Sequence, residues 1–284
     1  MNCKHCLFFQ ANQKGIQDEL STEEVMKIIH NVAQDDSVKA IWLSGGEPLL
    51  RDDIVAVCQE INDCGIEPSL STNGVLLTSD LICDLWEAGV KYIHLSLDGA
   101  NAETHNRLRG VPFAYEQLMK VMDLLKSSPI RTGASFMVTE ESIDEVDDVV
   151  SIALEKGLSV MSFYLVAELG RGATNFAEDK HSLAKRLAEK IEKMKKRQDL
   201  RNSSLTIEVF RADQLSEGEE GVLQIKERRE NISFCQECSH QSDCGKGCVA
   251  LQNNENDLYL SLDPICPELG RRKIASHLEV SERL

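Results

Sequence analysis

The stretch VKAIWLSGGEP, residues 38–48, contains a short apolar run that ends in a turn. Its apolar residues follow no helical period and are bounded by turn-forming residues, which predicts a buried β-strand. Gly45 and Gly46 let the backbone after this strand approach a ligand closely. Glu47, which precedes Pro48, supplies a carboxylate that can accept hydrogen bonds from an ammonium group. A tight turn without a ligand is the alternative for these residues.

Strand and helix patterns alternate on both sides of this stretch. Ser21, with Glu24 three residues later, forms a capping box that opens a helix. We expect further helices over about 52–63, 79–88, 101–126 (with a break) and 143–156, and strands over 66–71, 91–97, 132–138 and 159–165. This alternation, with short turns that contain Gly, Asn or Asp, predicts repeated βαβ units and a parallel sheet.

Length, hydropathy and charge narrow the class of protein. The 284 residues can form one large domain, or one domain with an appendage. The chain has no apolar run long enough to span a bilayer and no charged-then-apolar leader, so we expect a soluble, cytoplasmic protein with no membrane partner. The net charge of −16 argues against nucleic acid as a partner, because nucleic acid requires a basic face. The charge is typical of a solvated surface; attraction of a basic peptide segment is the alternative.

The ten cysteines fall into two groups. In a chain of this kind they are more often metal ligands or buried thiols than disulfides. Cys58, Cys64 and Cys83 lie singly in apolar helical stretches, so we predict that they are buried. The other seven lie near the two ends of the sequence and are candidate metal ligands: Cys3, Cys6, Cys235, Cys238, Cys244, Cys248 and Cys266.

Polar residues follow several of the predicted strands. The sequence STNG begins at Ser71 and includes Asn73, and SLDG begins at Ser96 and includes Asp98. His105, Arg107 and Arg109 follow SLDG. Because parallel α/β folds bind ligands at the carboxyl ends of their strands, these residues are candidate ligand contacts.

The leader MNCKHC, residues 1–6, and the GGEP turn together resemble the radical SAM superfamily. In that superfamily a C-x3-C-x2-C loop holds a [4Fe–4S] cluster, an aromatic residue or His commonly precedes the last Cys, and GGEP contacts the methionine end of S-adenosyl-L-methionine (SAM). Cys3, His5 and Cys6 match the last part of that loop. The first cysteine would lie four residues before Cys3, and the first strand of the barrel would precede it. One explanation covers both: we expect the true amino terminus to lie upstream.

The resemblance implies a fold and a set of ligand contacts. The fold is α/β, a partial (β/α)6 barrel that lacks its first strand. Ser71 and Asn73 would face SAM, Ser96 and Asp98 would contact its ribose or carboxylate, and Arg107 or Arg109 would pair with the methionine carboxylate. Leu165 would lie near the adenine. An electron from the cluster, supplied by a reductant such as ferredoxin or flavodoxin, would cleave SAM to a 5′-deoxyadenosyl radical that removes hydrogen from a substrate. With Cys3 and Cys6 alone, cluster binding should be impaired.

The carboxyl-terminal cysteines have the spacing C-x2-C-x5-C-x3-C followed by Cys266. Spacing alone permits a zinc site. The pattern also resembles the SPASM extension of radical SAM enzymes, and that resemblance implies one auxiliary [4Fe–4S] cluster held by Cys235, Cys238, Cys244 and Cys266. Cys248 would be a spare thiol, an alternative ligand or a relic. We therefore expect three parts: a radical SAM partial barrel (1–172), a helical and strand connector (173–232) and a SPASM-like domain (233–284).

The resemblance favours an enzyme that abstracts hydrogen from a peptide or protein side chain, as maturases with SPASM extensions do. Two alternatives remain within the same architecture: a haem- or cofactor-biosynthesis enzyme that acts on a small molecule, and a non-catalytic binding protein without a complete cluster loop. A structural protein held together by zinc is a fourth hypothesis, but it assigns no purpose to the residues at the strand ends.

Overall fold

The fold was analysed in a computed structural model of the whole chain. The structure describes residues 1–6, 19–35, 37–166, 171–176, 180–210, 253–254 and 257–261. The predicted carboxyl-terminal cluster ligands, Cys235 to Cys266, therefore lie outside the described residues.

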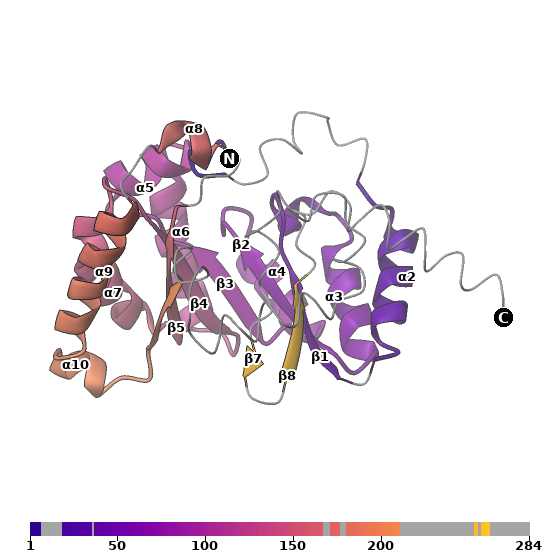
Figure 1. Cartoon of the computed structure of the whole chain (residues 1–284). Helices are drawn as coiled ribbons and strands as arrows, with labels where there is room; N and C mark the ends of the chain where they lie inside the picture. Colours follow the sequence, from indigo (N-terminus) through magenta and orange to yellow (C-terminus); the bar gives the residue numbers. More distant parts are fainter. Residues whose placement is uncertain are drawn as a thin grey trace.

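One curled, mostly parallel sheet organises the described residues (Figure 1). Its strand order is β6-β5-β4-β3-β2-β1-β8-β7. Each neighbouring pair from β1 to β6 is parallel, β8 is parallel to β1, and β7 is antiparallel to β8. The strands are β1 (Val38–Leu43), β2 (Glu67–Thr72), β3 (Tyr92–Ser96), β4 (Arg131–Val138), β5 (Val160–Leu165), β6 (Thr206–Phe210), β7 (Asn253–Asn254) and β8 (Asp257–Ser261).

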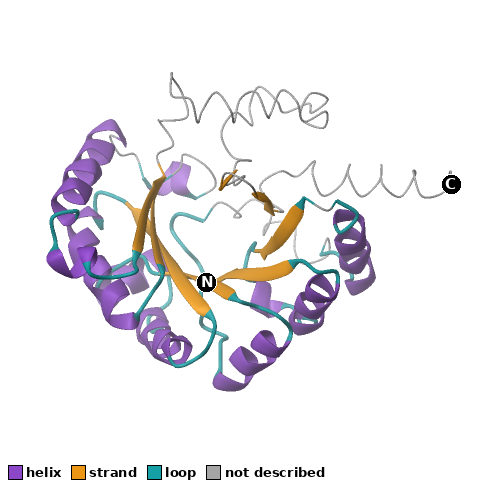
Figure 2. Cartoon of the chain, turned by 90° about the horizontal axis from the view of Figure 1, so that it is seen from below, coloured by secondary structure: helices purple, strands orange, loops and turns teal. Residues whose placement is uncertain are grey.

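Helices connect the strands and cover the convex face of the sheet (Figure 2). The long helices are α2 (Thr22–Val32), α3 (Ile54–Asp63), α4 (Ser79–Glu87), α5 (Ala102–Arg109), α6 (Ala114–Lys126), α7 (Val146–Lys156) and α9 (Lys180–Met194). The short ones are η2 (Pro48–Leu50), η3 (Ile143–Glu145), α8 (Gly172–Asn175) and α10 (Gln198–Arg201). This arrangement confirms the predicted partial α/β barrel. No helix in the described part of the chain is long and apolar enough to cross a membrane.

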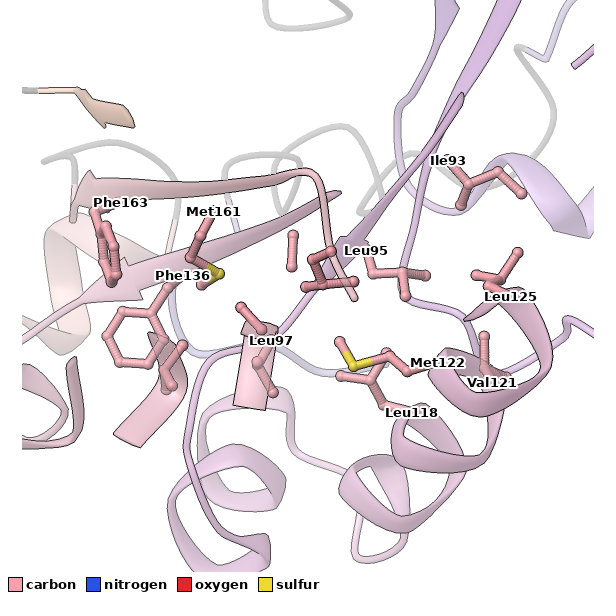
Figure 3. Packing of buried hydrophobic residues seen from close by; sticks show 14 of the residues in the cluster. Ile93, Leu95, Leu97, Leu118, Val121, Met122, Leu125, Phe136, Met161 and Phe163 are labelled. Carbon is pink, nitrogen blue, oxygen red and sulfur yellow. The ribbon is translucent and has the colours of Figure 1, made fainter. Parts of the chain in front are cut away.

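The hydrophobic core lies between the sheet and these helices (Figure 3). Alternate residues of each strand face it, for example Ile93 and Leu95 of β3 and Phe136 of β4. Leu118 and Met122 of α6, four residues apart on one helix face, belong to the same cluster and lie near Leu95. The predicted capping box is present, since Ser21 Oγ accepts from Glu24 N and Glu24 accepts from Ser21 N. The apolar period of the sequence therefore determined which face of each element is buried.

The strand residues that lie between these core residues face the concave side of the sheet, called here the inner face, and most of them are polar. By register they form rows across the sheet. One row contains Ser71, His94 and Gly133, and the next contains Ser96, Ser135, Ser162 and Glu208.

One expectation about these elements is corrected. Cys83 was predicted to be buried, but it is exposed, whereas Cys58 is buried and Cys64 is partly buried. Helix α4 turns its Ile82 and Leu85 toward the core. Cys83 follows Ile82 directly, so the helix rotates it by about 100° away from Ile82. The predicted strand in the connector joins the barrel sheet as β6, and β8 lies beside β1 at the other edge.

Candidate functional site

The leader residues 1–6 lie at the carboxyl ends of the strands and are held by backbone hydrogen bonds. Lys4 N donates to Leu108 O of α5 at 2.9 Å, and Arg171 N at the start of α8 donates to Cys6 O at 2.9 Å. Cys6 N donates to Cys3 O at 3.3 Å, which forms a short turn that contains both thiols. Cys3 and Cys6 are each partly exposed. The barrel therefore fixes both thiols on the rim where ligands of parallel α/β folds bind.

Asp98, two residues beyond β3, is the centre of a buried polar network at this rim. Its Oδ2 lies 2.6 Å from Arg109 Nη2 and 3.4 Å from His5 Nε2, and its Oδ1 accepts from Met137 N at 2.9 Å. Its backbone N donates to His105 Nδ1 at 3.1 Å. Burial opposes ionisation of Asp98, but the nearby Arg109 guanidinium and the hydrogen bond from Met137 N lower the pKa of this carboxyl. Asp98 thus joins the leader to β3, α5 and β4.

Arg109 brings a positive charge to a candidate cluster ligand. Its Nη1 donates to Cys3 Sγ at 3.8 Å, while Nη2 pairs with Asp98. Although burial disfavours a guanidinium, Asp98 and Cys3 raise the pKa of Arg109. Arg107, the other arginine expected near a methionine carboxylate, lies on the surface and pairs with Glu141 at 3.1 Å. The two arginines therefore have different environments, and only Arg109 lies in the site.

Burial lowers the pKa of His5 to about 4, against the opposing attraction of Asp98. The imidazole is therefore neutral near pH 7. Its Nδ1 is buried without a hydrogen-bond partner among the described residues, as is Arg109 Nε. Unpartnered buried polar atoms are uncommon and indicate that a further group belongs here.

The GGEP turn joins two neighbouring strand ends. The Glu47 carboxylate accepts from Thr72 Oγ1 at 2.5 Å, from Asn73 N at 2.9 Å and from Leu49 N at 3.2 Å. Pro48 is the first residue of η2. Glu47 is thus rigidly placed between β1 and β2, with a satisfied carboxylate that can still receive a donor from a ligand, since each carboxylate oxygen has two lone pairs.

The two glycines of this turn border open space. Gly45 has a φ of +144°, a conformation that favours glycine. A Cβ placed on Gly45 or Gly46 would have no atom of the described residues within 4 Å. A ligand can therefore approach the backbone here, as the sequence predicted.

The other predicted contacts have more varied positions. Ser71 Oγ accepts from Trp42 Nε1 at 2.9 Å on the inner face, and Asn73 Oδ1 accepts from Val75 N at 2.9 Å. Ser96 is half-buried at the end of β3. Leu165 ends β5 and packs in the hydrophobic core.

Sequence reasoning missed one of the residues that organise this site from a distance. Thr72 holds Glu47 and does not stand out from its local pattern. His105, named from the sequence as a candidate ligand contact, instead accepts from the backbone of Asp98. The polar inner face, with Tyr92 and His94, was also missed. Period-two alternation in the strands was the available signal for it.

Comparisons with known proteins agree with this geometry. The family model described as the radical SAM superfamily matches residues 1–153. An AdoMet-dependent heme synthase of Methanosarcina barkeri is 33% identical over 172 residues, which cover 61% of this chain and 49% of the synthase. A PqqA peptide cyclase of Rhizobium meliloti is 32% identical over 138 residues, which cover 49% of this chain and 36% of the cyclase. The chain spans at most about half the length of these curated relatives.

A similar fold occurs in a solved structure, Streptococcus suis SuiB bound to precursor peptide SuiA. The TM-score is 0.61 with 17% sequence identity, and the match covers 80% of this chain and 48% of SuiB. At this identity the likeness concerns the fold alone. Membership of the radical SAM superfamily implies a [4Fe–4S] cluster and S-adenosyl-L-methionine. Because the family model covers more than half of the sequence, the chain belongs to the radical SAM superfamily.

Proposed function

We propose that this chain is the radical-forming part of an enzyme that abstracts hydrogen from a side chain of a peptide or protein. The observation that carries this proposal is the composition of the inner face. Arg131 lies on this face at the start of β4. Beyond the row that contains Arg131, the described inner positions from β2 to β6 carry hydroxyl, imidazole, aromatic and apolar groups and one carboxylate, Glu208, and none is Lys or Arg.

The residues at the rim fit the cofactors that the family implies. Cys3 and Cys6 offer two partly exposed thiols on one turn, and thiolates are the usual ligands of iron–sulfur clusters. The open backbone at Gly45 and Gly46 can receive the methionine end of SAM next to Glu47. When bound, the cluster and SAM would together supply the 5′-deoxyadenosyl radical. Arg109 would place a positive charge at Cys3, and Asp98 would hold Arg109 and His5 in position.

The inner face suits a substrate group that donates hydrogen bonds. Glu208 accepts from Ser162 Oγ at 2.8 Å. Burial, the Glu208 carboxylate and Tyr164 raise the pKa of Tyr92, so this phenol stays neutral. Burial also lowers the pKa of His94 to about 4, which keeps the imidazole neutral near pH 7. Beyond the row of Tyr92 and Arg131, the described face thus presents one negative charge among neutral groups, and such a surface prefers amide or ammonium groups of a peptide to carboxylates.

Aromatic side chains form one wall of this face. Trp42 contacts Tyr92 and His94 edge to face, with ring centroids 5.5 and 5.8 Å away. Tyr92 Oη lies 3.0 Å from His94 Nδ1, while His94 Nε2 has no partner among the described residues. The wall would exclude water from an inserted side chain, and His94 Nε2 would offer it a hydrogen bond.

A second candidate is modification of a tetrapyrrole, and the similarity to heme synthases favours it. A coproporphyrin carries propionate carboxylates, which are usually bound by Arg or Lys. Arg131 at the start of β4 is the cation that the inner positions of β2 to β6 provide among the described residues, and one cation cannot pair with several propionates, so this candidate requires cations from other parts of the protein.

The remaining expectations stay part of the proposal. Cys235, Cys238, Cys244 and Cys266 would hold one auxiliary [4Fe–4S] cluster, and a ferredoxin or flavodoxin would supply electrons. The division into parts at residues 172 and 232 is likewise proposed.

The test is anaerobic reconstitution followed by measurement of 5′-deoxyadenosine with reductant and SAM. Short synthetic peptides that differ at one central residue would be compared with coproporphyrin III for their ability to stimulate this product. Stimulation by peptides, reduced in Glu208→Gln but not in the matched exposed variant Glu116→Gln, supports the proposal. Stimulation by coproporphyrin III alone would establish the second candidate instead.

A further inference from the structure

A second cluster of metal-binding side chains lies at the end of the barrel opposite the rim site. His30 of α2, Glu60 of α3 and Cys64 at the end of α3 each offer one ligand atom, and the three atoms lie within 4.8 Å of one another. His30 Nε2 lies 2.5 Å from Glu60 Oε1. Helices α2 and α3 end just before β1 and β2 begin, so this cluster lies at the amino ends of the strands, away from Cys3 and Cys6.

The backbone around these three residues is held firmly. Glu60 and Cys64 are four residues apart on one helix face, and Cys64 N donates to Glu60 O at 3.1 Å. Helix α3 ends at Asp63 with Cys64 as its C-cap; Gly65 follows with a φ of +77°, and Ile66 N donates to Ile61 O at 3.2 Å. Ile29, which precedes His30 in α2, is buried with Ile61 of α3 in a separate hydrophobic cluster beneath the two helices.

The ligand tips remain accessible above this apolar base. The side chains of His30 and Glu60 are 56% and 33% exposed, so an ion can enter from solvent. Glu60 and the neighbouring Asp63 place negative charge beside Cys64, and this charge attracts a divalent cation.

We propose that His30, Glu60 and Cys64 form a zinc site that links α2 to α3. One nitrogen, one oxygen and one sulfur donor suit Zn²⁺, whereas Mg²⁺ and Ca²⁺ prefer oxygen donors alone. Tetrahedral zinc separates its ligand atoms by about 3.3–3.6 Å, so His30 and Glu60 would move apart by less than about 1 Å while the Cys64 thiol approaches. Binding releases the thiol proton to solvent, and water takes the fourth position.

This site would have a structural role, because it is remote from the rim. It would fix α2 against α3 near their carboxyl ends, where each helix leads into the next strand of the sheet. A plain His30–Glu60 hydrogen bond is the competing explanation, and it assigns no role to Cys64.

The test follows the reaction of individual cysteines with N-ethylmaleimide in the full chain, quantified by peptide mass spectrometry with and without zinc. With free zinc at about ten times the Kd, alkylation of Cys64 should slow about tenfold, because only unoccupied sites react. The exposed Cys83 in the same chain is the internal control and should react equally fast in both conditions. His30→Ala should remove the protection of Cys64.

A second measurement separates ligation from a change in folding. Cobalt should produce a thiolate-to-cobalt absorption band whose amplitude is smaller in Cys64→Ala but unchanged in Cys83→Ala. The proposal is overturned if zinc leaves Cys64 alkylation unchanged, if His30→Ala keeps full protection, or if the Cys64→Ala and wild-type cobalt spectra coincide.

Discussion

Arg109 Nη2 lies 2.6 Å from Asp98 Oδ2, and both side chains are buried. The pair connects α5 to the end of β3, and Arg109 continues to Cys3 while Asp98 continues to His5. The conformation of the cysteine leader therefore depends on a buried charge pair in the barrel.

Asp98→Asn should lower the free energy of unfolding by about 3–5 kcal/mol, because it leaves the Arg109 guanidinium buried without its counterion. Urea unfolding followed by circular dichroism measures this change. The matched control is Arg107→Gln, which breaks the exposed pair with Glu141 and should cost at most about 1 kcal/mol. Equal costs for the two variants would contradict the assignment of Asp98 as the centre of the network.

Stability should fall as the pH drops below about 6.5. Burial lowers the pKa of His5, His94 and His105 from 6.5 to about 4 in the folded chain. The unfolded chain then binds more protons between about pH 6.5 and 4, so each histidine contributes a loss of up to about 1.4 kcal/mol per pH unit in that window.

The measurement is urea unfolding at several pH values across that window. His94→Gln removes one of the three buried imidazoles and should reduce the slope of stability against pH by about a third. An unchanged slope would show that His94 does not titrate with unfolding.

Gly133→Ala should destabilise the chain by about 1–3 kcal/mol through overpacking. A Cβ at this position would overlap Tyr92 Oη and lie 3.0 Å from His94 Nδ1, which leaves no room for the Tyr92–His94 pair. Tyr92→Phe removes the overlapping hydroxyl, so the double variant should lose less stability than the two single losses combined. Simple additivity of the two changes, measured by thermal or urea unfolding, would refute this packing argument.

Gly46→Ala should separate ligand binding from stability. Its Cβ would meet no atom of the described residues, so the free energy of unfolding should change by no more than about 0.5 kcal/mol. The same methyl would occupy space next to Glu47, so we expect SAM affinity in the reconstituted protein to fall about tenfold, or about 1.4 kcal/mol. Equilibrium dialysis with labelled SAM measures this, with Ser44→Ala in the same turn as the control. Unchanged affinity would place SAM elsewhere.

The sequence by itself determined the elements and the fold class. Its apolar period located the strands from β1 to β5 and the helices that connect them. Short-range signals also located the Ser21 cap, the break between α5 and α6, and the glycines after β1. These features depend on neighbours within a few residues, so a linear pattern is sufficient to reveal them.

Only the tertiary structure decided which strand ends and side chains meet. Cys3 contacts Arg109, β8 lies beside β1, and His30 meets Glu60 and Cys64, although each of these partners is distant in the sequence. The alternation within one strand likewise does not predict that Tyr92 fills the space above Gly133 on the next. Such contacts depend on strand order, register and the curvature of the sheet, which arise when many weak non-local interactions form together.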